Sequence, residues 1–245
     1  MKVWIEADNQ SICNASARAL VQLIDDTLQV SEKFTIALAG GTTPKVLYQL
    51  LATEELSQQI PWQQMHVYFG DERSVGPEHE DSNYRMACEA LLNHVAIPSE
   101  NIHRIQGEAN NIKSAAASYA QELDQGLSKN EDNYPQFDLV LLGLGPDGHV
   151  ASLFPDTDIL KQKDAWADAV WVEKLSTWRV SITYPLINHA KHVWLFVAGE
   201  TKANIIEQVL GDKAEEFSYP VQGIEAQGQL LWFLDEAAAS KLDKD

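Results

Sequence analysis

The chain alternates between short apolar runs and longer stretches with helical periodicity. Because such alternation requires crossover connections, it predicts an α/β fold: a doubly wound, mainly parallel sheet with helices on both faces. The continuous apolar runs "FTIALA" and "DLVLLGL" fit strands buried on both faces. The strand-like runs are Val3–Glu6, Thr35–Ala39, His66–Phe69, Leu139–Leu142, Ala169–Val172, Val180–Thr183, Val193–Val197 and Leu230–Leu234. The helix-period stretches are Ala15–Leu28, Pro44–Leu51, Ser82–His94, Ile112–Leu127 and Lys202–Leu210.

The sequence shows no break between domains. No internal repeat, low-complexity tract or Pro/Ser-rich linker interrupts the 245 residues, so we expect a single domain over residues 1–245. The stretch "LSKNEDNYPQ", residues 127–136, is predicted as a surface loop between a helix and a strand. In a doubly wound sheet, ligands bind beyond the carboxyl ends of the strands, so a site is expected in the loops that directly follow strands.

The formal net charge of −18 at pH 7 limits the partners of the protein. Coulomb repulsion disfavours nucleic acid and anionic membrane surfaces, and no apolar run is long enough to span a bilayer. The segment "MKVWIEADNQ" lacks the apolar core of a signal peptide, so we expect a cytoplasmic protein, a monomer or a small homo-oligomer. Cys13 and Cys88 are expected to be reduced thiols on helices.

The first loop of interest, in "TIALAGGTTPKVLYQLL", is rich in glycine and threonine. Gly40 and Gly41 turn the chain, Thr43 is predicted as the N-cap of the next helix, and Pro44 as its first residue. Free backbone N–H groups and the helix dipole attract phosphate at such a terminus. The Gly-Gly-Thr signal is short, however, and an ordinary strand-to-helix turn explains it equally well.

Three cations stand near predicted strand ends. Arg73 follows the strand in "VYFGDERSV", and a guanidinium suits bidentate contact with phosphate or a carbonyl oxygen. Arg179 begins a strand, and Lys202 begins a helix for which Thr201 is the expected cap. Each cation has the alternative of a plain surface charge or ion pair. Their positions in an acidic protein nevertheless favour anion binding.

An acid-rich run, Glu78-His79-Glu80-Asp81, follows Arg73. It lacks the ligand spacing of a metal motif and is predicted as a solvated loop. Ser82, directly after it, is the expected N-cap of the next helix.

The loop in "DLVLLGLGPDGHVASLFP" contains G-x-G-x-x-G directly after a strand, as a dinucleotide-binding turn does. In such a turn the third glycine opens a long helix, whereas here Pro155 limits a following helix to about two turns. We expect His149 in the first turn of that short helix, where the positive helix end disfavours its cation and leaves it available as a base. The loop therefore predicts a catalytic histidine and no dinucleotide site.

A serine nucleophile is not indicated, because the nucleophile elbow G-x-S-x-G is absent. Ser152 and Ser181 lie in the motifs without such an elbow. The other histidines considered have no comparable context and are interpreted as structural or surface residues: His66, His79, His103, His189 and His192.

Taken together, four segments resemble the 6-phosphogluconolactonase family, which forms a superfamily with the glucosamine-6-phosphate deaminases. They follow the family's order across essentially the whole chain, and the third is highly specific. The resemblance implies a doubly wound, modified Rossmann-like α/β fold. The segments are "ALAGGTTP", "VYFGDERSV", "LLGLGPDGHVASLFP" and "RVSITYPLINHAKHVWLFVAGETKA".

The resemblance implies hydrolysis of the anionic sugar-phosphate lactone 6-phospho-D-glucono-1,5-lactone to 6-phospho-D-gluconate, in the oxidative pentose phosphate pathway, with no cofactor and no metal. His149 matches the catalytic histidine that activates water, and Asp147 helps hold its loop. Which cation binds phosphate and which stabilises the oxyanion stays open. Val150 stands where many members have Thr. The remaining matches are the substrate loop Gly40, Gly41, Thr42 and Thr43 and the cationic positions Arg73, Arg179 and Lys202.

Two alternatives stay open. Glucosamine-6-phosphate deaminases, which also isomerise their substrate, share the Asp-Gly-His loop but have an acidic residue where this chain has Phe154. They also usually have Asp-Glu-Tyr where it has Asp71-Glu72-Arg73. A non-catalytic sugar-phosphate-binding module is disfavoured because His149 is retained and no basic helix-turn-helix extension is present.

Overall fold

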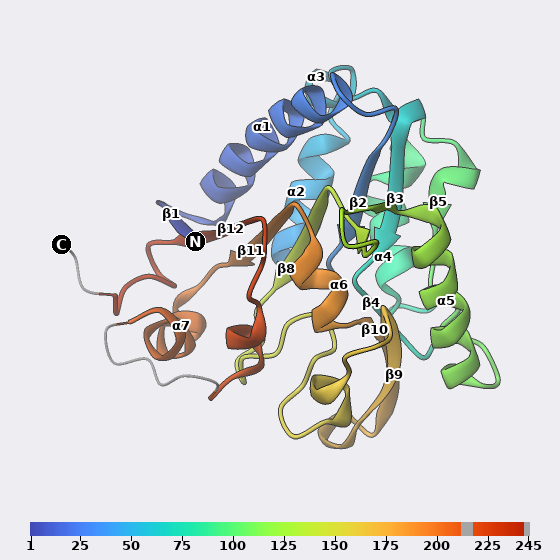
Figure 1. Cartoon of the computed structure of the whole chain (residues 1–245). Coiled ribbons are helices and arrows are strands. Elements are labelled where there is room, and N and C mark those ends of the chain that lie inside the picture. The colour runs from blue at the N-terminus through green and yellow to red at the C-terminus, as the bar shows by residue number, and fades with distance from the viewer. Residues whose placement is uncertain (212–217, 243–245) are drawn as a thin grey trace.

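A seven-stranded parallel sheet forms the centre of the molecule (Figure 1). The computed structural model describes residues 1–211 and 218–242. The strand order is β1-β12-β11-β8-β2-β3-β5, and the neighbours pair in parallel. The predicted doubly wound α/β fold is confirmed. The strands are β1 (Lys2–Glu6), β2 (Phe34–Leu38), β3 (Met65–Phe69), β5 (Ile102–His103), β8 (Leu139–Gly143), β11 (His192–Val197) and β12 (Gln229–Asp235).

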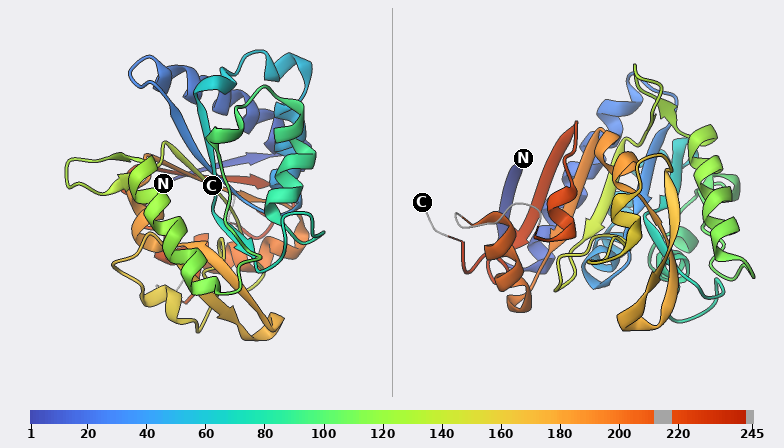
Figure 2. Two further views of the ribbon diagram at one scale, coloured as in Figure 1. Left: turned by 90° about the vertical axis from the view of Figure 1, so that its right-hand side faces the viewer. Right: turned by 60° about the horizontal axis from the view of Figure 1, so that its bottom comes forward.

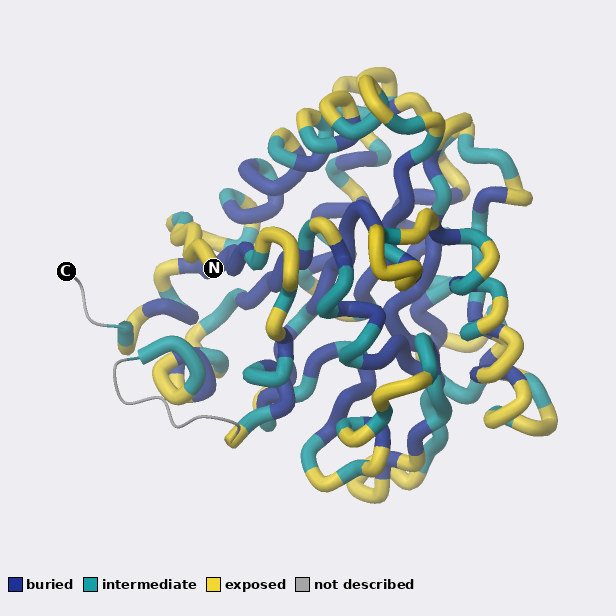
Figure 3. Tube along the Cα trace, viewed as in Figure 1, coloured by how far each residue is buried: buried dark blue, intermediate teal, exposed yellow. Residues whose placement is uncertain are grey.

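Helices cover the sheet on both faces. α1, α2 and α4 lie side by side on one face, while α5 and α6 lie on the other. The core is continuous from the central strands to the inner sides of the helices, with the exposed residues at the periphery (Figure 3). Within the described residues no helix is both long and apolar enough to cross a membrane. The helices are α1 (Asn9–Leu28), α2 (Thr42–Leu51), α3 (Glu54–Ser57), α4 (Asn83–Ala90), α5 (Ile112–Gly126), α6 (Tyr184–His189) and α7 (Ala203–Leu210).

A second, antiparallel sheet of three strands stands beside the central one, in the order β4 (Asp71–Arg73), β10 (Thr177–Ile182), β9 (Ala167–Val172). It projects from the body of the molecule (Figure 2). The sequence pattern did not separate these strands from the parallel sheet. The four residues 173–176 that join β9 to β10 allow a hairpin but are too few for a crossover connection.

Two further expectations are corrected. Residues 127–136 are not a plain loop, because β6 (Ser128–Lys129) and β7 (Pro135–Gln136) pair antiparallel within them. The helix expected up to His94 ends at Ala90 and is followed by a 3₁₀ turn. Ser82 is confirmed as the N-cap of α4, since its hydroxyl accepts a hydrogen bond from the backbone N–H of Arg85.

The order of winding reverses between β2 and β8. From β2 the chain proceeds through β3 to β5 on one side, and from β8 through β11 to β12 on the other. Only Ile36 and Ala37 of β2 pair with β8, at Leu139 and Val140, so the two strands part before their carboxyl ends. Such a switch point leaves a crevice between the following loops, which is where a ligand site is expected.

Candidate active site

A cavity of about 320 Å³ opens at this switch point. It lies between the loop after β2 and the loop after β8, with β4, β10 and the segment after β11 completing its walls. Most of the residues singled out in the sequence meet here. Gly40, Gly41, Thr42, Thr43, Arg73, His149, Arg179 and Lys202 all line the cavity, whereas Asp147 lies outside its lining.

The loop after β8 differs from its prediction. Residues 144–157 contain turns and no helix, so His149 is not at a helix N-terminus. One glycine of the motif, Gly145, makes room for the histidine directly. A Cβ at Gly145 would lie 2.0 Å from Nδ1 of His149, and Gly148 has a φ of +75° that favours glycine. Gly145 of the G-x-G-x-x-G motif thus leaves space for the imidazole of His149.

His149 is held by Asp147 two residues before it. Its Nδ1 lies 2.5 Å from Oδ1 of Asp147, so Nδ1 carries the proton and Nε2 keeps the lone pair. The ring also stacks on Phe154, with centroids 4.0 Å apart. Burial lowers the pKa of His149 by more than Asp147 raises it. The neutral form of the imidazole is therefore favoured, and the cause is burial, not the helix dipole expected from the sequence.

The pKa of Asp147 lies far below its ordinary value. Burial acts to raise it, but hydrogen bonds from Lys174 and His149 lower the pKa to about 2. The carboxylate therefore stays ionised wherever the protein is folded at moderate pH. An ionised Asp147 fixes the Nδ1–H tautomer of the neighbouring imidazole.

The glycine-threonine loop leads into α2 earlier than expected. The helix starts at Thr42, its N-cap is Gly41 with a φ of +104°, and no side chain caps it. Thr43 is therefore not the cap, and Pro44 is the third residue of the helix. Gly41 adopts a positive φ, which favours glycine, and the helix begins directly after it at Thr42. The backbone N–H groups of Thr42 and Thr43 have no intrahelical partner, and both residues line the cavity.

Arg73 and Arg179 come from neighbouring strands and stand directly opposite each other in the register of β4 and β10. Arg179 therefore lies within the second sheet and does not begin a strand. Nη1 of Arg73 donates to the carbonyl of Asp81 at 2.5 Å, and Nη1 of Arg179 lies 3.8 Å from Oδ2 of Asp71. Within the described residues, the buried Nε atoms of both arginines have no hydrogen-bond partner. Two guanidinium groups that line one cavity suit an anionic ligand.

Lys202 enters the cavity from another wall. It ends the 3₁₀ turn Glu200–Lys202 just before α7, and Thr201 does not cap that helix. The Lys202 ammonium donates to the carbonyl of Leu144 at 2.7 Å, which connects it to the loop that carries His149. Burial lowers the pKa of Lys202, and the negative charge of Asp147 partly offsets this effect.

The acid-rich run Glu78–Asp81 contacts neighbouring arginines through its backbone carbonyl groups. Its carbonyl groups accept hydrogen bonds from Arg85 and Arg73. Across residues 1–211 and 218–242, no group of three or more His, Cys, Asp or Glu side chains is arranged to hold a metal ion.

Comparison with known proteins identifies the family. A family model described as glucosamine-6-phosphate isomerases/6-phosphogluconolactonase matches residues 7–232. The chain belongs to this family. A 6-phosphogluconolactonase of Nostoc sp. is 40% identical over 244 residues, 99% of each chain. One from Synechocystis sp. is 42% identical over 208 residues, 85% of this chain and 84% of that one. The solved structure of a 6-phosphogluconolactonase from Trypanosoma cruzi matches with a TM-score of 0.87 at 28% identity, covering 99% and 97% of the two chains.

Two residues at which the sequence departs from the resemblances described above, Val150 and Phe154, lie close to His149. Phe154 is nearly buried and forms the stacking partner of the imidazole. Val150, at the position of the common Thr, is fully buried and pairs with Leu153 in an isolated β-bridge. An aromatic ring therefore supports the histidine at the position for which the resemblance to deaminases would imply an acidic residue.

Sequence reasoning assigned no role to the polar residues beneath the arginines. Asp71 is buried and accepts hydrogen bonds from Oγ of Ser152 at 2.6 Å and Nδ2 of Asn83 at 3.0 Å. The same carboxylate faces Arg179, so this network holds the guanidinium from below. Its one signal in the sequence is an acid placed directly after a buried strand, in "VYFGDERSV".

Proposed function

We propose that the protein hydrolyses 6-phospho-D-glucono-1,5-lactone to 6-phospho-D-gluconate, in the oxidative pentose phosphate pathway. The observation that carries the proposal is a neutral, carboxylate-held histidine at a cavity lined by Arg73, Arg179 and Lys202. Relatives named 6-phosphogluconolactonase that match nearly the full chain support the same activity. A base beside clustered cations suits a phosphorylated lactone, because the ester needs an activated water and the phosphate needs positive charge.

His149 is the proposed general base. Nε2 takes a proton from a water molecule while the water oxygen attacks the lactone carbonyl carbon. The resulting imidazolium is stabilised by Asp147, which already accepts the proton on Nδ1. When the tetrahedral intermediate collapses, the bond to the ring oxygen breaks and the imidazolium returns its proton to that oxygen. The open-chain acid is then the product, and the base is regenerated.

The cations and the start of α2 are the proposed anion-binding groups. Arg73, Arg179, Lys202 and the backbone of Gly40–Thr43 hold the phosphate and stabilise the oxyanion between them. Kinetics separate the two tasks. Loss of a phosphate contact raises KM, whereas loss of a group that binds only the oxyanion lowers kcat.

Phe154 and Arg73 argue against the deaminase activity found in the same family. An apolar ring stacks on His149 at the position for which the deaminase resemblance implies an acidic residue, and Arg73 stands where that resemblance implies a tyrosine. Ammonia release from glucosamine 6-phosphate at a rate near that of lactone hydrolysis would replace the proposal with the deaminase reaction.

The test is a coupled assay on freshly generated lactone, corrected for spontaneous hydrolysis. We expect His149→Ala to lower kcat by roughly 10²–10⁴-fold, because a positioned general base contributes about that much. Binding of 6-phosphogluconate should largely survive, since the cations remain. His94→Ala, at an exposed position outside the cavity lining, is the matched control, and its kcat should equal that of the wild type. An unaltered rate in His149→Ala would remove His149 from the mechanism.

A further inference from the structure

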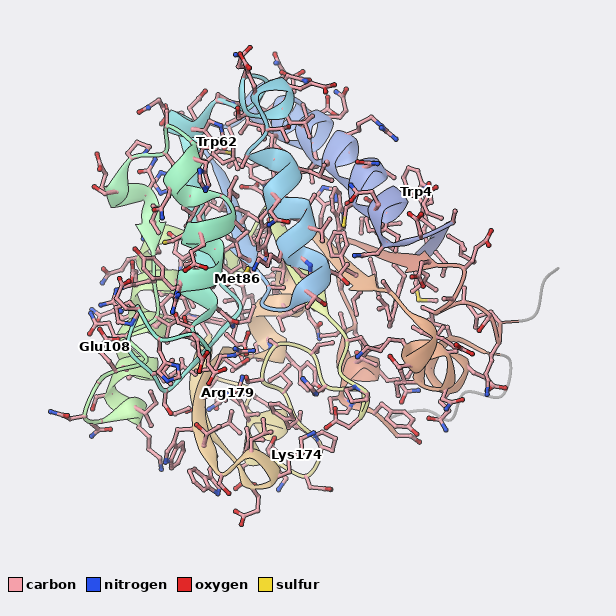
Figure 4. All side chains as sticks on the ribbon, turned by 180° about the vertical axis from the view of Figure 1, so that it is seen from behind. Trp4, Trp62, Met86, Glu108, Lys174 and Arg179 are labelled. Atoms are coloured by element: carbon pink, nitrogen blue, oxygen red, sulfur yellow. The ribbon has the colours of Figure 1, made fainter. Side chains whose placement is uncertain are left out.

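Lys174 reaches the catalytic dyad from an element that the sequence did not connect with it. It lies on the 3₁₀ turn Glu173–Leu175 between β9 and β10. Figure 4 labels Lys174, on this turn, and Arg179, on β10 of the projecting sheet. The Lys174 ammonium donates to Oδ2 of Asp147, which is 27 residues before it in the chain.

The two oxygens of Asp147 therefore have different partners. Oδ1 accepts from Nδ1 of His149, and Oδ2 accepts from Lys174. A carboxylate bonded at one oxygen alone can rotate about its terminal torsion, whereas one bonded at both is fixed. The hydrogen bond from Lys174 thus fixes the plane in which Asp147 meets the imidazole.

Lys174 also contacts the other support of His149. Its Nζ lies 4.7 Å from the ring centroid of Phe154, within the range of a cation–π contact. Phe154 in turn stacks on the imidazole at 4.0 Å. One ammonium group thereby touches both side chains between which His149 is held.

The charge of Lys174 acts on His149 as well as its geometry. The positive charge of Lys174 lowers the pKa of His149, opposing the carboxylates, although burial is the largest cause of the lowered value. Removing the ammonium leaves the negative charge of Asp147 less compensated. The charged groups that bear on the imidazole are Asp147 on its own loop, Asp71 on β4 and Lys174 on the β9–β10 turn, with Arg73, Arg179 and Lys202 in the same cavity lining.

We propose that Lys174 is a positioning residue that holds Asp147 and Phe154 in place around His149, so that the β9–β10 turn is part of the active site. The proposal rests on the hydrolytic function proposed above. It gives the projecting antiparallel sheet two tasks: β4 and β10 supply Arg73 and Arg179, and the turn supplies the group that orients the base.

The kinetic test compares Lys174→Met with Lys174→Arg. We expect Lys174→Met to lower kcat roughly 10-fold or more, with KM changed less than about 3-fold, because the base is misoriented while the anion-binding groups remain. The acid limb of the kcat/KM profile should move to higher pH, since the pKa of His149 rises. Lys174→Arg keeps the charge and should restore both. Lys161→Met removes an exposed lysine paired with Asp158 and serves as the control.

A purely structural role for Lys174 would lower stability without moving the pH profile. A wild-type profile in folded Lys174→Met, or no recovery in Lys174→Arg, overturns the proposal. ¹⁵N NMR of the imidazole makes the test independent of turnover. If the protein does not hydrolyse the lactone, the function proposed above fails. The positioning role of Lys174 still requires that the titration of His149 shift to higher pH and that its Nδ1–H tautomer fraction fall in Lys174→Met. An unchanged titration of His149 in Lys174→Met refutes the positioning role of Lys174, whatever the substrate is.

Discussion

At the scale of single residues, the site depends on how closely backbone and imidazole approach. His149 packs against Gly145 so tightly that the position of a Cβ is already occupied by ring atoms, and Oδ1 of Asp147 lies 2.8 Å from the same point. A side chain at residue 145 therefore competes with the dyad for space. The requirement for glycine here comes from the neighbouring ring, not from the backbone conformation of Gly145.

We expect Gly145→Ala to lower kcat by roughly 100-fold, because a displacement of about 1 Å at a catalytic base has effects of that size. Unfolding should be little affected, since the loop borders an open cavity. Gly76→Ala is a matched control, because nothing lies within 4 Å of a Cβ at that position. Steady-state kinetics of the two variants measure kcat, and thermal melting measures their stability. Near wild-type activity in Gly145→Ala would show that the loop accommodates the methyl group without moving His149.

At the scale of secondary-structure elements, the sequence predicts the parallel strands except the two-residue edge strand β5, and it predicts the connections poorly. The apolar runs that form β2 and β8 are buried on both faces of the sheet. A strand covered on both faces has a continuous apolar run, which can be recognised from the residues of that strand alone. The turn after Gly148 depends instead on contacts with distant groups such as Tyr219, which would collide with a Cβ at Gly148. Pattern reasoning predicted a short helix there because it considers only neighbouring residues.

The same distinction explains which site residues could be anticipated. His149 and Lys202 follow strands of one parallel sheet, and the carboxyl ends of such strands meet at one edge, so their convergence follows from the fold class. Lys174 gave no such signal, because its position depends on the β9–β10 hairpin packing beside the cavity. The catalytic and binding roles, like the single domain over residues 1–245, stay predictions until they are measured.

A pair of histidines lies where β3 pairs with the edge strand β5, and we expect it to make stability depend on pH. Nδ1 of His66 lies 3.2 Å from Nε2 of His103, whose Nδ1 lies 2.7 Å from Glu122. Burial, followed by the charges of Lys33 and His103, lowers the pKa of His66 below its ordinary value of 6.5. As the pH falls, the unfolded chain therefore takes up a proton at His66 before the folded chain does. The contribution of neutral His66 to the free energy of unfolding is present above pH 6.5 and is lost as the pH falls toward the folded-state pKa.

We expect the free energy of unfolding to fall between pH 7 and pH 5, and to fall less steeply in His66→Gln. Urea denaturation at several pH values measures both slopes. His94→Gln, which changes an exposed histidine, provides the comparison. Identical slopes for the wild type and His66→Gln would show that His66 titrates alike in the folded and unfolded chains.

At the scale of the whole molecule, a net charge of −18 surrounds a cavity lined by three cations. The two fields act on an anionic substrate with opposite sign. Arg73, Arg179 and Lys202 act at contact distance and are partly buried, so solvent weakens their attraction little, whereas the acidic surface acts through water. The local attraction should therefore govern binding.

We expect KM for 6-phosphogluconolactone to rise with added salt, because ions compete with and screen the attraction of the cavity for phosphate, with a Debye length of about 8 Å at physiological ionic strength. Steady-state kinetics from low to high sodium chloride measure the slope. Arg179→Gln should show a higher KM and a weaker dependence on salt, since one of the three cations is gone. A KM that falls as salt is added would mean that screening of the acidic surface dominates. The cavity cations would then not be the main source of binding energy for the phosphate.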